Sequence, residues 1–340
     1  MKRSLPLLLL ALSLCAALPA RAASSRWTQL GPAGHGQGEI LSLASDPSRP
    51  DRVFAGLFGG GIARSGDGGR SWRSFGEGLR IPVINWIVVH PALGRLVFAS
   101  DGVFLYRSLN DGRTWEPSSL RGVRALAADP RDPNVAWAAA FGGLYRTRDR
   151  GTTWERVQAN LPRGYGATSV TISPADPRRM YVMVTAPSGF GLWTTADGGR
   201  TWVRRNRARA VLGIVLQADL HDARTVYLLN FREIQRSRDT GQTFELFFNT
   251  GAAGSPLDLQ PRFLALDPLD PAVAYVSFAF SGIGDGLYRT TDGGRTWRLL
   301  SAGLPESFVL TALAVSSEGT VLLGLETFGS LAVYRSADRG

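Results

Sequence analysis

The chain has 340 residues, of which 44% are hydrophobic, and its formal net charge is +10. Its one cysteine, Cys15, lies in an N-terminal leader, which excludes disulfides and thiolate metal sites from a chain that has lost that leader. Stability must then come from a hydrophobic core, and residues 23–340 are numerous enough to bury one.

The leader has the features of a secretory signal peptide. A basic start at Lys2 and Arg3 precedes an apolar run over residues 5–14, and Ala20-Arg21-Ala22 offers small residues for cleavage. The run is too short to stay in a bilayer as a helix, and no later stretch is long and apolar enough to cross one. We therefore expect residues 1–22 to be removed and the product to be periplasmic or extracellular. Lipidation at Cys15 is the alternative, but Leu14 stands where a lipobox has a small residue.

The positive charge of the mature chain is carried by arginine, because Lys2 is the only lysine. The base composition of the source genome explains this most simply. A basic surface nevertheless favours acidic partners, such as anionic glycans, membrane headgroups or acidic protein loops. We recognise no nucleic-acid-binding motif and expect no nucleic-acid partner.

The mature chain repeats a set of four short runs that are rich in β-branched and aromatic residues and bounded by Asp, Pro and Gly. Such runs are typical of strands separated by turns. The expected strands cover 40–44, 52–57, 61–65 and a run from Trp72 in the first repeat; 123–127, 134–140, 144–147 and a run from Trp154 in the third; and 263–266, 273–278, 287–290 and a run from Trp297 in the sixth.

One motif, here called the acidic turn, joins the third and fourth strands of each repeat. It reads Ser/Thr-x-Asp-x-Gly-x-Ser/Thr-aromatic, and its copies start 39 to 53 residues apart, a spacing typical of propeller blades. We expect its carboxylate to accept hydrogen bonds from backbone amides two residues on, and its fifth residue, glycine, to adopt a positive φ. The acidic or amide residues are Asp67, Asn110, Asp149, Asp197, Asp239, Asp292 and Asp338, and the closing aromatic anchors are Trp72, Trp115, Trp154, Trp202, Phe244 and Trp297.

The last repeat stops at Gly340, inside its acidic turn, without an aromatic anchor or a fourth strand. The start of the mature chain supplies both, because Trp27-Thr28-Gln29-Leu30 resembles Trp297-Arg298-Leu299-Leu300. We predict an all-β, seven-bladed propeller of four-stranded antiparallel blades in a single domain over 23–340, with the ring closed by the N-terminal strand in the last blade.

The acidic turns resemble the Asp-box, or bacterial neuraminidase repeat, of sialidases, sortilin-type receptors, xyloglucanases and photosystem II assembly factors. The resemblance covers nearly all of the mature chain. It implies the propeller fold and places function on loops of the face opposite the boxes. In length and layout the chain looks most like the photosystem II assembly factor-like branch, which implies a role in binding protein.

No catalytic, cofactor or metal site is predicted. His35, His90 and His221 lie in separate repeats, and the sequence has no nucleophile elbow, phosphate loop or dinucleotide fingerprint. Leu79-Arg80-Ile81-Pro82 looks like a sialidase motif, but it follows an acidic turn where that family places it before one. Paired-carboxylate glycoside hydrolysis needs two acids about 5 to 10 Å apart, which a sequence cannot place.

The candidate binding residues come from connections expected on the face opposite the acidic turns. A run of arginines could pair bidentately with carboxylates or phosphates, although a solvated charge run is the simpler explanation. Trp86, beside the inner strand of the second blade, is interpreted as a packing residue in preference to a sugar-stacking one. The set is Arg204, Arg205, Arg207 and Arg209 in the run; Arg163 and Tyr165 on a pliable loop; Phe231 and Arg232 at the channel mouth; and Trp86.

These observations favour an exported, non-enzymatic binding or assembly-helper propeller, monomeric, with an acidic protein partner. A glycan-binding or glycoside-hydrolysing protein is the alternative.

Overall fold

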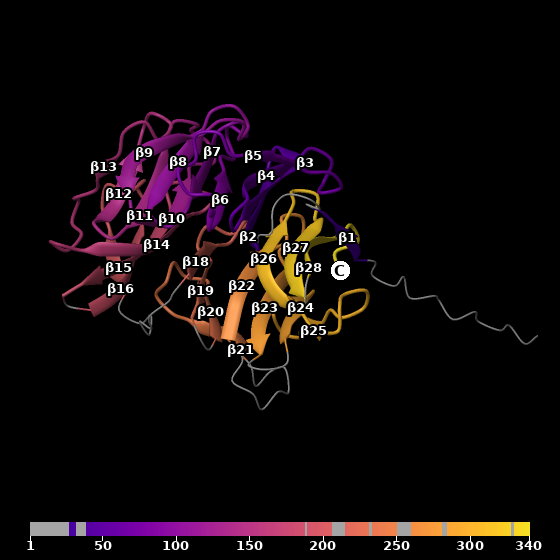
Figure 1. The fold of residues 1–340 in the computed structure, drawn as a ribbon. Coiled ribbons are helices and arrows are strands. Elements are labelled where there is room, and N and C mark those ends of the chain that lie inside the picture. Colours follow the sequence, from indigo (N-terminus) through magenta and orange to yellow (C-terminus); the bar gives the residue numbers. More distant parts are fainter. Residues whose placement is uncertain are drawn as a thin grey trace, which may run out of the picture.

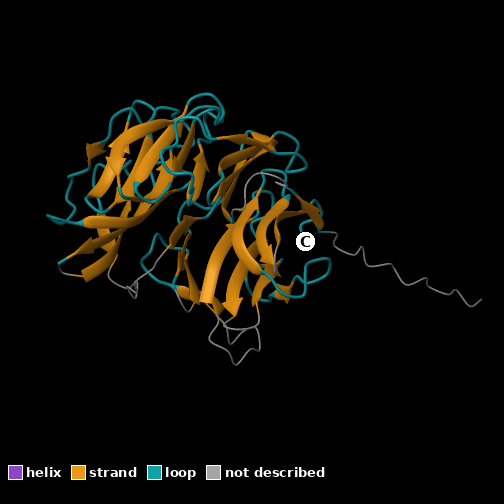
Figure 2. Cartoon of the chain, viewed as in Figure 1, coloured by secondary structure: helices purple, strands orange, loops and turns teal. Residues whose placement is uncertain are grey.

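The computed structural model describes residues 27–31, 39–187, 189–205, 215–230, 233–249, 260–280, 284–327 and 330–340. Its regular elements within these ranges are all β-strands (Figure 2). They form seven four-stranded antiparallel sheets that follow one another in chain order (Figure 1). The predicted seven-bladed propeller is confirmed. The leader 1–22, His35, Arg207, Arg209, Phe231 and Arg232 lie outside the described residues.

Each of the first six blades is built from four consecutive strands, numbered from the innermost outward. Blade 1 consists of β2 (Ile40–Asp46), β3 (Arg49–Leu57), β4 (Gly61–Ser65) and β5 (Arg73–Phe75). Blade 2 consists of β6 (Trp86–Val89), β7 (Val97–Ser100), β8 (Phe104–Ser108) and β9 (Glu116–Arg121). Blade 3 consists of β10 (Val123–Ala128), β11 (Ala136–Ala140), β12 (Gly143–Thr147) and β13 (Glu155–Arg156).

Blades 4 to 6 repeat this order. Blade 4 consists of β14 (Gly166–Ile172), β15 (Met180–Ala186), β16 (Gly189–Thr195) and β17 (Val203–Arg205). Blade 5 consists of β18 (Val215–Ala218), β19 (Val226–Leu229), β20 (Glu233–Ser237) and β21 (Glu245–Asn249). Blade 6 consists of β22 (Gln260–Leu266), β23 (Ala274–Phe280), β24 (Gly284–Thr290) and β25 (Arg298–Leu299).

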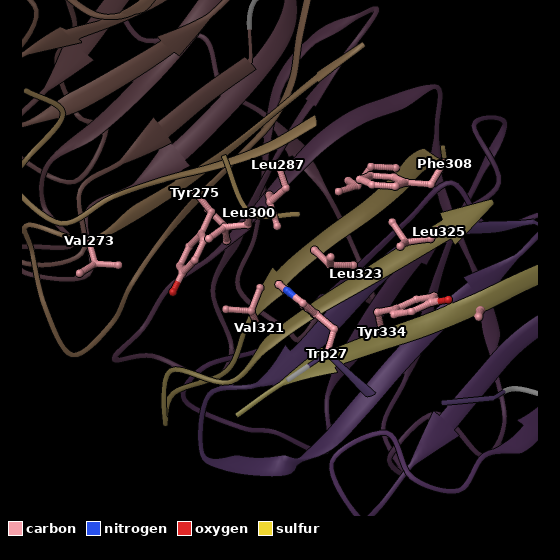
Figure 3. Close-up of a cluster of buried hydrophobic side chains, with 13 residues drawn as sticks. Trp27, Val273, Tyr275, Leu287, Leu300, Phe308, Val321, Leu323, Leu325 and Tyr334 are labelled. Atoms are coloured by element: carbon pink, nitrogen blue, oxygen red, sulfur yellow. The ribbon is translucent and has the colours of Figure 1, made fainter. Parts of the chain in front are cut away.

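Blade 7 joins the two ends of the chain. Its strands β26 (Val309–Val315), β27 (Val321–Thr327) and β28 (Ser330–Ser336) are completed by β1 (Thr28–Leu30), which pairs antiparallel with β28 in the register Gln29 to Tyr334. Trp27 is buried beside Leu300 and Tyr275 of blade 6 (Figure 3). The predicted ring closure is therefore confirmed, and Trp27 is the aromatic anchor of the last blade.

The hydrophobic core lies between neighbouring blades. One buried cluster, for example, joins Trp137 and Leu144 of blade 3 to Val182 and Trp202 of blade 4. Because each blade buries one face against the blade before it and the other against the blade after it, the core is a ring of seven interfaces. The second strands are accordingly apolar on both faces, as the fully buried run of β11 shows.

The acidic turns are held together by hydrogen bonds within each turn. In blade 1, Asp67 Oδ1 accepts from the amide of Ser71 at 2.8 Å, and Asp67 Oδ2 accepts from the Ser71 hydroxyl at 2.6 Å. The hydroxyl of Ser65 binds Asp67 and accepts from the amide of Gly69. The amide bound by the carboxylate thus lies four residues on, and our expectation of two residues was wrong. The same pair of bonds recurs at Asp149, Asp197, Asp239 and Asp292, and in amide form at Asn110.

The fifth residue of the acidic turn needs to be glycine for two reasons. Gly294 has a φ of +89°, which disfavours any side chain, and a Cβ on it would lie 2.5 Å from Phe247 of the preceding blade. The turn of one blade thus packs directly on the core side chains of the blade before it.

The aromatic anchors stand one residue before the strands that they were expected to begin. Trp72 precedes β5, Trp154 precedes β13 and Trp297 precedes β25. In these positions the indole rings turn inward, and Trp72, Trp115 and Trp202 are buried. Trp154, Trp297 and Phe244 are partly buried against the same kind of interface.

Candidate functional site

A hollow of about 750 Å³ opens on the face opposite the acidic turns. It lies where the first strands of blades 2 to 5 begin and where the second and third strands of blades 2 to 4 are joined. Antiparallel pairing sends these ends of the strands to one face and the acidic turns to the other. The described residues that line it are Asn85, Trp86, Gly102, Val123, Arg124, Phe141, Gly166, Ala167, Thr168, Met183, Thr185, Phe190 and Val215.

Phe141 is the most exposed apolar side chain of this lining. It stands in the tight turn between β11 and β12, with 68% of its surface exposed. The Arg124 guanidinium lies 4.0 Å from the centre of its ring, a cation–π contact. Gly122 leaves room for the ring, because a Cβ there would meet Phe141 at 2.9 Å. Phe141 is thus an aromatic platform with a positive charge on it.

The sequence reasoning missed Phe141 and Arg124. A signal was present, because Phe141-Gly142-Gly143 repeats the Phe58-Gly59-Gly60 of blade 1, and a large apolar residue in a glycine turn is exposed. Phe58 is indeed 55% exposed, at the equivalent position of blade 1. Val103 is 50% exposed in the corresponding turn of blade 2, between β7 and β8. The first three blades therefore each present an apolar side chain on this face.

Further arginines gather beside the hollow. The guanidinium groups of Arg80 and Arg121 lie 5.0 and 4.7 Å from the centre of the Phe104 ring. The backbone amide of Arg80 donates to Tyr106 Oη, which donates in turn to the buried Asp101 at 2.8 Å. Burial and this bond raise the pKa of Tyr106. The Leu79–Pro82 connection is thus fixed to the face of blade 2.

Trp86 lines the hollow and also packs in the interface between blades 2 and 3. It is the first residue of β6, is partly buried and lies against the cluster that contains Val123 and Leu126. One side of its indole is therefore committed to packing and the remainder faces the hollow.

Tyr165 is not on the surface, and our expectation that it is a contact residue was wrong. Only 2% of it is exposed, and its hydroxyl donates to Val157 O at 2.6 Å and accepts from the amide of Leu144. Burial raises the pKa of this phenol, although the Leu144 amide and Arg156 oppose the rise. The loop turns the ring inward because the phenol completes the core between blades 3 and 4. Arg163, on the same loop, is exposed.

Arg204 and Arg205 do not belong to a surface loop, as we expected, but to β17, the outer strand of blade 4. Neighbouring residues of a strand point to opposite sides, so the two cannot face one ligand together. Arg205 is partly buried, and its Nε donates to Thr194 Oγ1 at 3.1 Å. Arg204 is exposed. A four-arginine patch is therefore not supported by the two arginines that the structure describes.

The described histidines have structural surroundings. His90 is fully buried, its Nδ1 accepts from the amide of Ala92, and its Nε2 lies 3.2 Å from Val135 O of the next blade. Burial lowers its pKa. Within the described residues no three His, Cys, Asp or Glu side chains are grouped to hold a metal ion. Nor does that part of the chain contain a helix that could span a membrane.

Comparisons with known proteins identify the fold and related sequences. No protein-family model matches the chain. A xyloglucanase of Acetivibrio thermocellus is 26% identical over 60% of this chain, but the match spans only 23% of that enzyme. The GH74 xyloglucanase of Xanthomonas campestris superposes on 92% of the chain with a TM-score of 0.69 and 20% identity, and 54% of that enzyme is covered.

Structures of YCF48 are similar as well. YCF48 from Cyanidioschyzon merolae matches with a TM-score of 0.60 and 15% identity, and YCF48 bound to D1 peptide with 0.63 and 16%. Each match covers 92% of this chain. It covers 98% of the YCF48 chain in the first structure and 96% in the peptide-bound one. At these identities the structural matches establish the propeller fold alone.

Proposed function

We propose that this chain is an exported, non-enzymatic binding or assembly-helper propeller. It holds a segment of a partner protein in the hollow opposite the acidic turns. The observation that carries the proposal is the exposed Phe141 ring beneath the Arg124 guanidinium. An apolar ring that stays exposed in a concave, largely pre-formed site is a recognition element. Export rests on the signal-like residues 1–22.

Charge supports an acidic segment. Arg124 lies in the wall of the hollow, and Arg80 and Arg121 flank Phe104 nearby. The described lining contains no Asp or Glu, so an incoming carboxylate meets no like charge there. The apolar ring and the guanidinium together fit a segment in which an apolar residue stands beside an acidic one. The YCF48 structures support this, since this chain matches nearly the whole length of YCF48 and one of them holds a peptide.

A glycan is the second candidate. Trp86, Phe141 and Phe190 bring aromatic side chains to the hollow, where they could stack on sugar rings, and several relatives are xyloglucanases. The described lining does not supply the two carboxyl groups of a glycoside hydrolase, so these residues favour binding over cleavage.

Peptide selection with a matched control tests the proposal. A random dodecapeptide library is selected on the purified protein, and the recovered peptides are titrated against Phe141→Ala and Phe58→Ala. Phe58 is also exposed but lies outside the described lining. We expect apolar-acidic peptides and a loss of about tenfold or more in affinity with Phe141→Ala, because roughly 1.5–3 kcal/mol is gained on burying a Phe side chain. Phe58→Ala should leave affinity unchanged.

Two outcomes contradict the proposal. One is selection of no peptide that depends on Phe141. The other is saturable binding, or turnover, of xyloglucan oligosaccharides that is lost with Phe141→Ala, which would establish the glycan alternative.

A further inference from the structure

An arginine in the third strand normally fastens one blade to the next. Arg64 Nη1 donates to Asp111 O at 2.7 Å, and Arg236 Nη1 donates to Gly293 O at 2.8 Å, in each case in the acidic turn of the following blade. Longer bonds join Arg107 to Arg150 O at 3.4 Å and Arg289 to Gly340 O at 3.3 Å. Each of these guanidinium groups thus donates at least one hydrogen bond to the next blade, although the Nε of Arg289 is buried without a partner.

Arg146 occupies the same position in blade 3 and is not used in this way. It makes no hydrogen bond to another described residue, and its Nε is buried without a partner. Its nearest acidic group, Glu155, lies 3.8 Å from Nη2 and is 73% exposed. Arg107, by contrast, donates through Nε and Nη2 to Glu116 at 3.1 and 2.8 Å. A buried charged donor without a partner is costly unless something binds it.

A pocket of about 400 Å³ opens in front of Arg146, at the junction of blades 3 and 4. We call it the junction pocket. Its walls come from β12, the acidic turn of blade 3, β13 and the segment that follows, and from the acidic turn of blade 4. The charged and polar residues that line it are Arg146, Arg148, Glu155, Arg156, Gln158 and Arg200. Four arginines face one carboxylate, so the pocket is strongly positive.

The four arginines of the junction pocket differ in whether their guanidinium groups already bind other residues of the chain. Arg156 is held, because its Nε donates to Gly142 O at 2.6 Å and its Nη2 to Tyr165 O. Arg148 and Arg200 are exposed, and no described residue binds their guanidinium groups. The Arg146 guanidinium lies over the ring of Trp137, which fixes its plane. A fixed guanidinium with two free ones around it is suited to a group with several acceptor oxygens.

The junction of blades 7 and 1 offers a comparison. Arg335 stands at the equivalent position, and its Nε also lacks a partner. A Cβ at Gly68 of the following turn would lie 3.6 Å from that Nε, so the turn itself covers Arg335. Arg146 instead lines the junction pocket, and 24% of its side chain is exposed although its Nε is buried.

We propose that the junction pocket is a binding site for a tetrahedral oxyanion, sulfate or a phosphate or sulfate monoester. The oxyanion accepts hydrogen bonds from Arg146, and Arg148 and Arg200 close over it. Glu155, which is solvated and weakly paired, moves aside. This site lies toward the acidic-turn side of the propeller and is separate from the hollow that contains Phe141.

Titration calorimetry with defined anions tests the site. Sodium sulfate, sodium phosphate, glucose 6-sulfate and glucose 6-phosphate are titrated into the protein, with chloride holding the ionic strength constant. We expect one saturable site. If the sugar esters bind and the free ions do not, the ligand is a monoester carried on a sugar. If both bind, the site recognises the anion alone.

Three variants make the test specific. Arg200→Ala should weaken binding about tenfold, since one charge-assisted hydrogen bond is lost. Glu155→Gln should strengthen it, because the competing carboxylate is removed. Arg295→Ala removes the arginine at the same turn position of blade 6 and should change nothing. The proposal is wrong if no anion saturates the protein, if Arg295→Ala weakens binding as much as Arg200→Ala, or if Glu155→Gln weakens it.

Discussion

The guanidinium of Arg64 in blade 1 donates a 2.7 Å hydrogen bond to the backbone carbonyl of Asp111 in the acidic turn of blade 2. This bond ties two blades together, and equivalent bonds recur around the ring. Where blade 4 has Thr194 in place of the arginine, Arg205 reaches in from the outer strand and packs against Gly241 of the next turn. Part of the arginine content, which we attributed to base composition, thus has a structural use.

Removing this bond should loosen the first two blades. We expect Arg64→Ala to lower the free energy of unfolding by about 1 to 2 kcal/mol, because the Asp111 carbonyl loses a charged donor. The contact of Arg64 with the Phe75 ring at 4.6 Å is lost as well. Urea denaturation measures the change. Arg73→Ala, an exposed arginine of the neighbouring strand, is the control, and an equal effect there would contradict the prediction.

Substitutions at two adjacent glycines of the acidic turn of blade 6 distinguish the stability cost of backbone strain from the cost of a packing clash. At Gly293, φ is +72° and a Cβ would meet nothing within 4 Å, whereas at Gly294, φ is +89° and a Cβ would lie 2.5 Å from Phe247. Gly293→Ala should therefore cost only the strain of the left-handed backbone, about 1 kcal/mol. Gly294→Ala should cost that and a further 1 to 3 kcal/mol or so for overpacking. Equal losses in thermal unfolding would refute this reading of the turn.

Ring closure depends on the anchor supplied by the N-terminal segment. Trp27 is 8% exposed among Leu300, Tyr275 and their neighbours (Figure 3). Trp27→Ala should cost about 3 to 5 kcal/mol, the usual result of deleting a buried aromatic ring. Trp27→Phe should recover most of the loss. Denaturation monitored by circular dichroism gives both values, and a Trp27→Ala protein as stable as the wild type would mean that the ring does not need this anchor.

Acid should destabilise the turns. Burial acts to raise the pKa of Asp67, but the hydroxyl and amide of Ser71 outweigh it, and the pKa falls to about 2 from 3.8. The pKa values of Asp149 and Asp239 are also about 2, because the hydroxyls and amides of Thr153 and Thr243 likewise outweigh burial. Each group has a lower pKa folded than unfolded. Its contribution is thus complete above 3.8 and is lost as the pH falls toward 2.

Replacing these three carboxylates by amides tests the assignment. Asn110 already fills the slot in blade 2, where its Oδ1 accepts from the amide of Thr114 at 3.0 Å. The triple variant Asp67→Asn, Asp149→Asn and Asp239→Asn should fold. Its free energy of unfolding should fall less between pH 4 and pH 2 than that of the wild type. Glu306→Gln, an exposed carboxyl outside the turns, serves as the control, and a wild-type pH slope in the triple variant would contradict the assignment.

The repeated acidic turn was sufficient to predict the fold, because each of the first six blades joins its third and fourth strands with the same kinds of residues at the same spacing. Asp292, Gly294 and the anchor Trp297 act within a few residues of one another, so their spacing in the sequence is their spacing in the turn. The match of Trp27 to Trp297 likewise predicted the ring closure, which the pairing of β1 with β28 confirms.

The candidate site depended on contacts that the sequence does not encode locally. Tyr165 and Phe141 both stand on loops of the same face. Tyr165 turns inward because Leu144 and Val157 satisfy its hydroxyl, and Phe141 stays outside because Arg124 and Gly122 hold it there. These partners come from other strands, so only the tertiary structure decided which ring belongs to the core and which stays exposed. The sequence of the acidic turns thus determined the closed ring of blades, and packing between blades determined which side chains are exposed on the face opposite the turns.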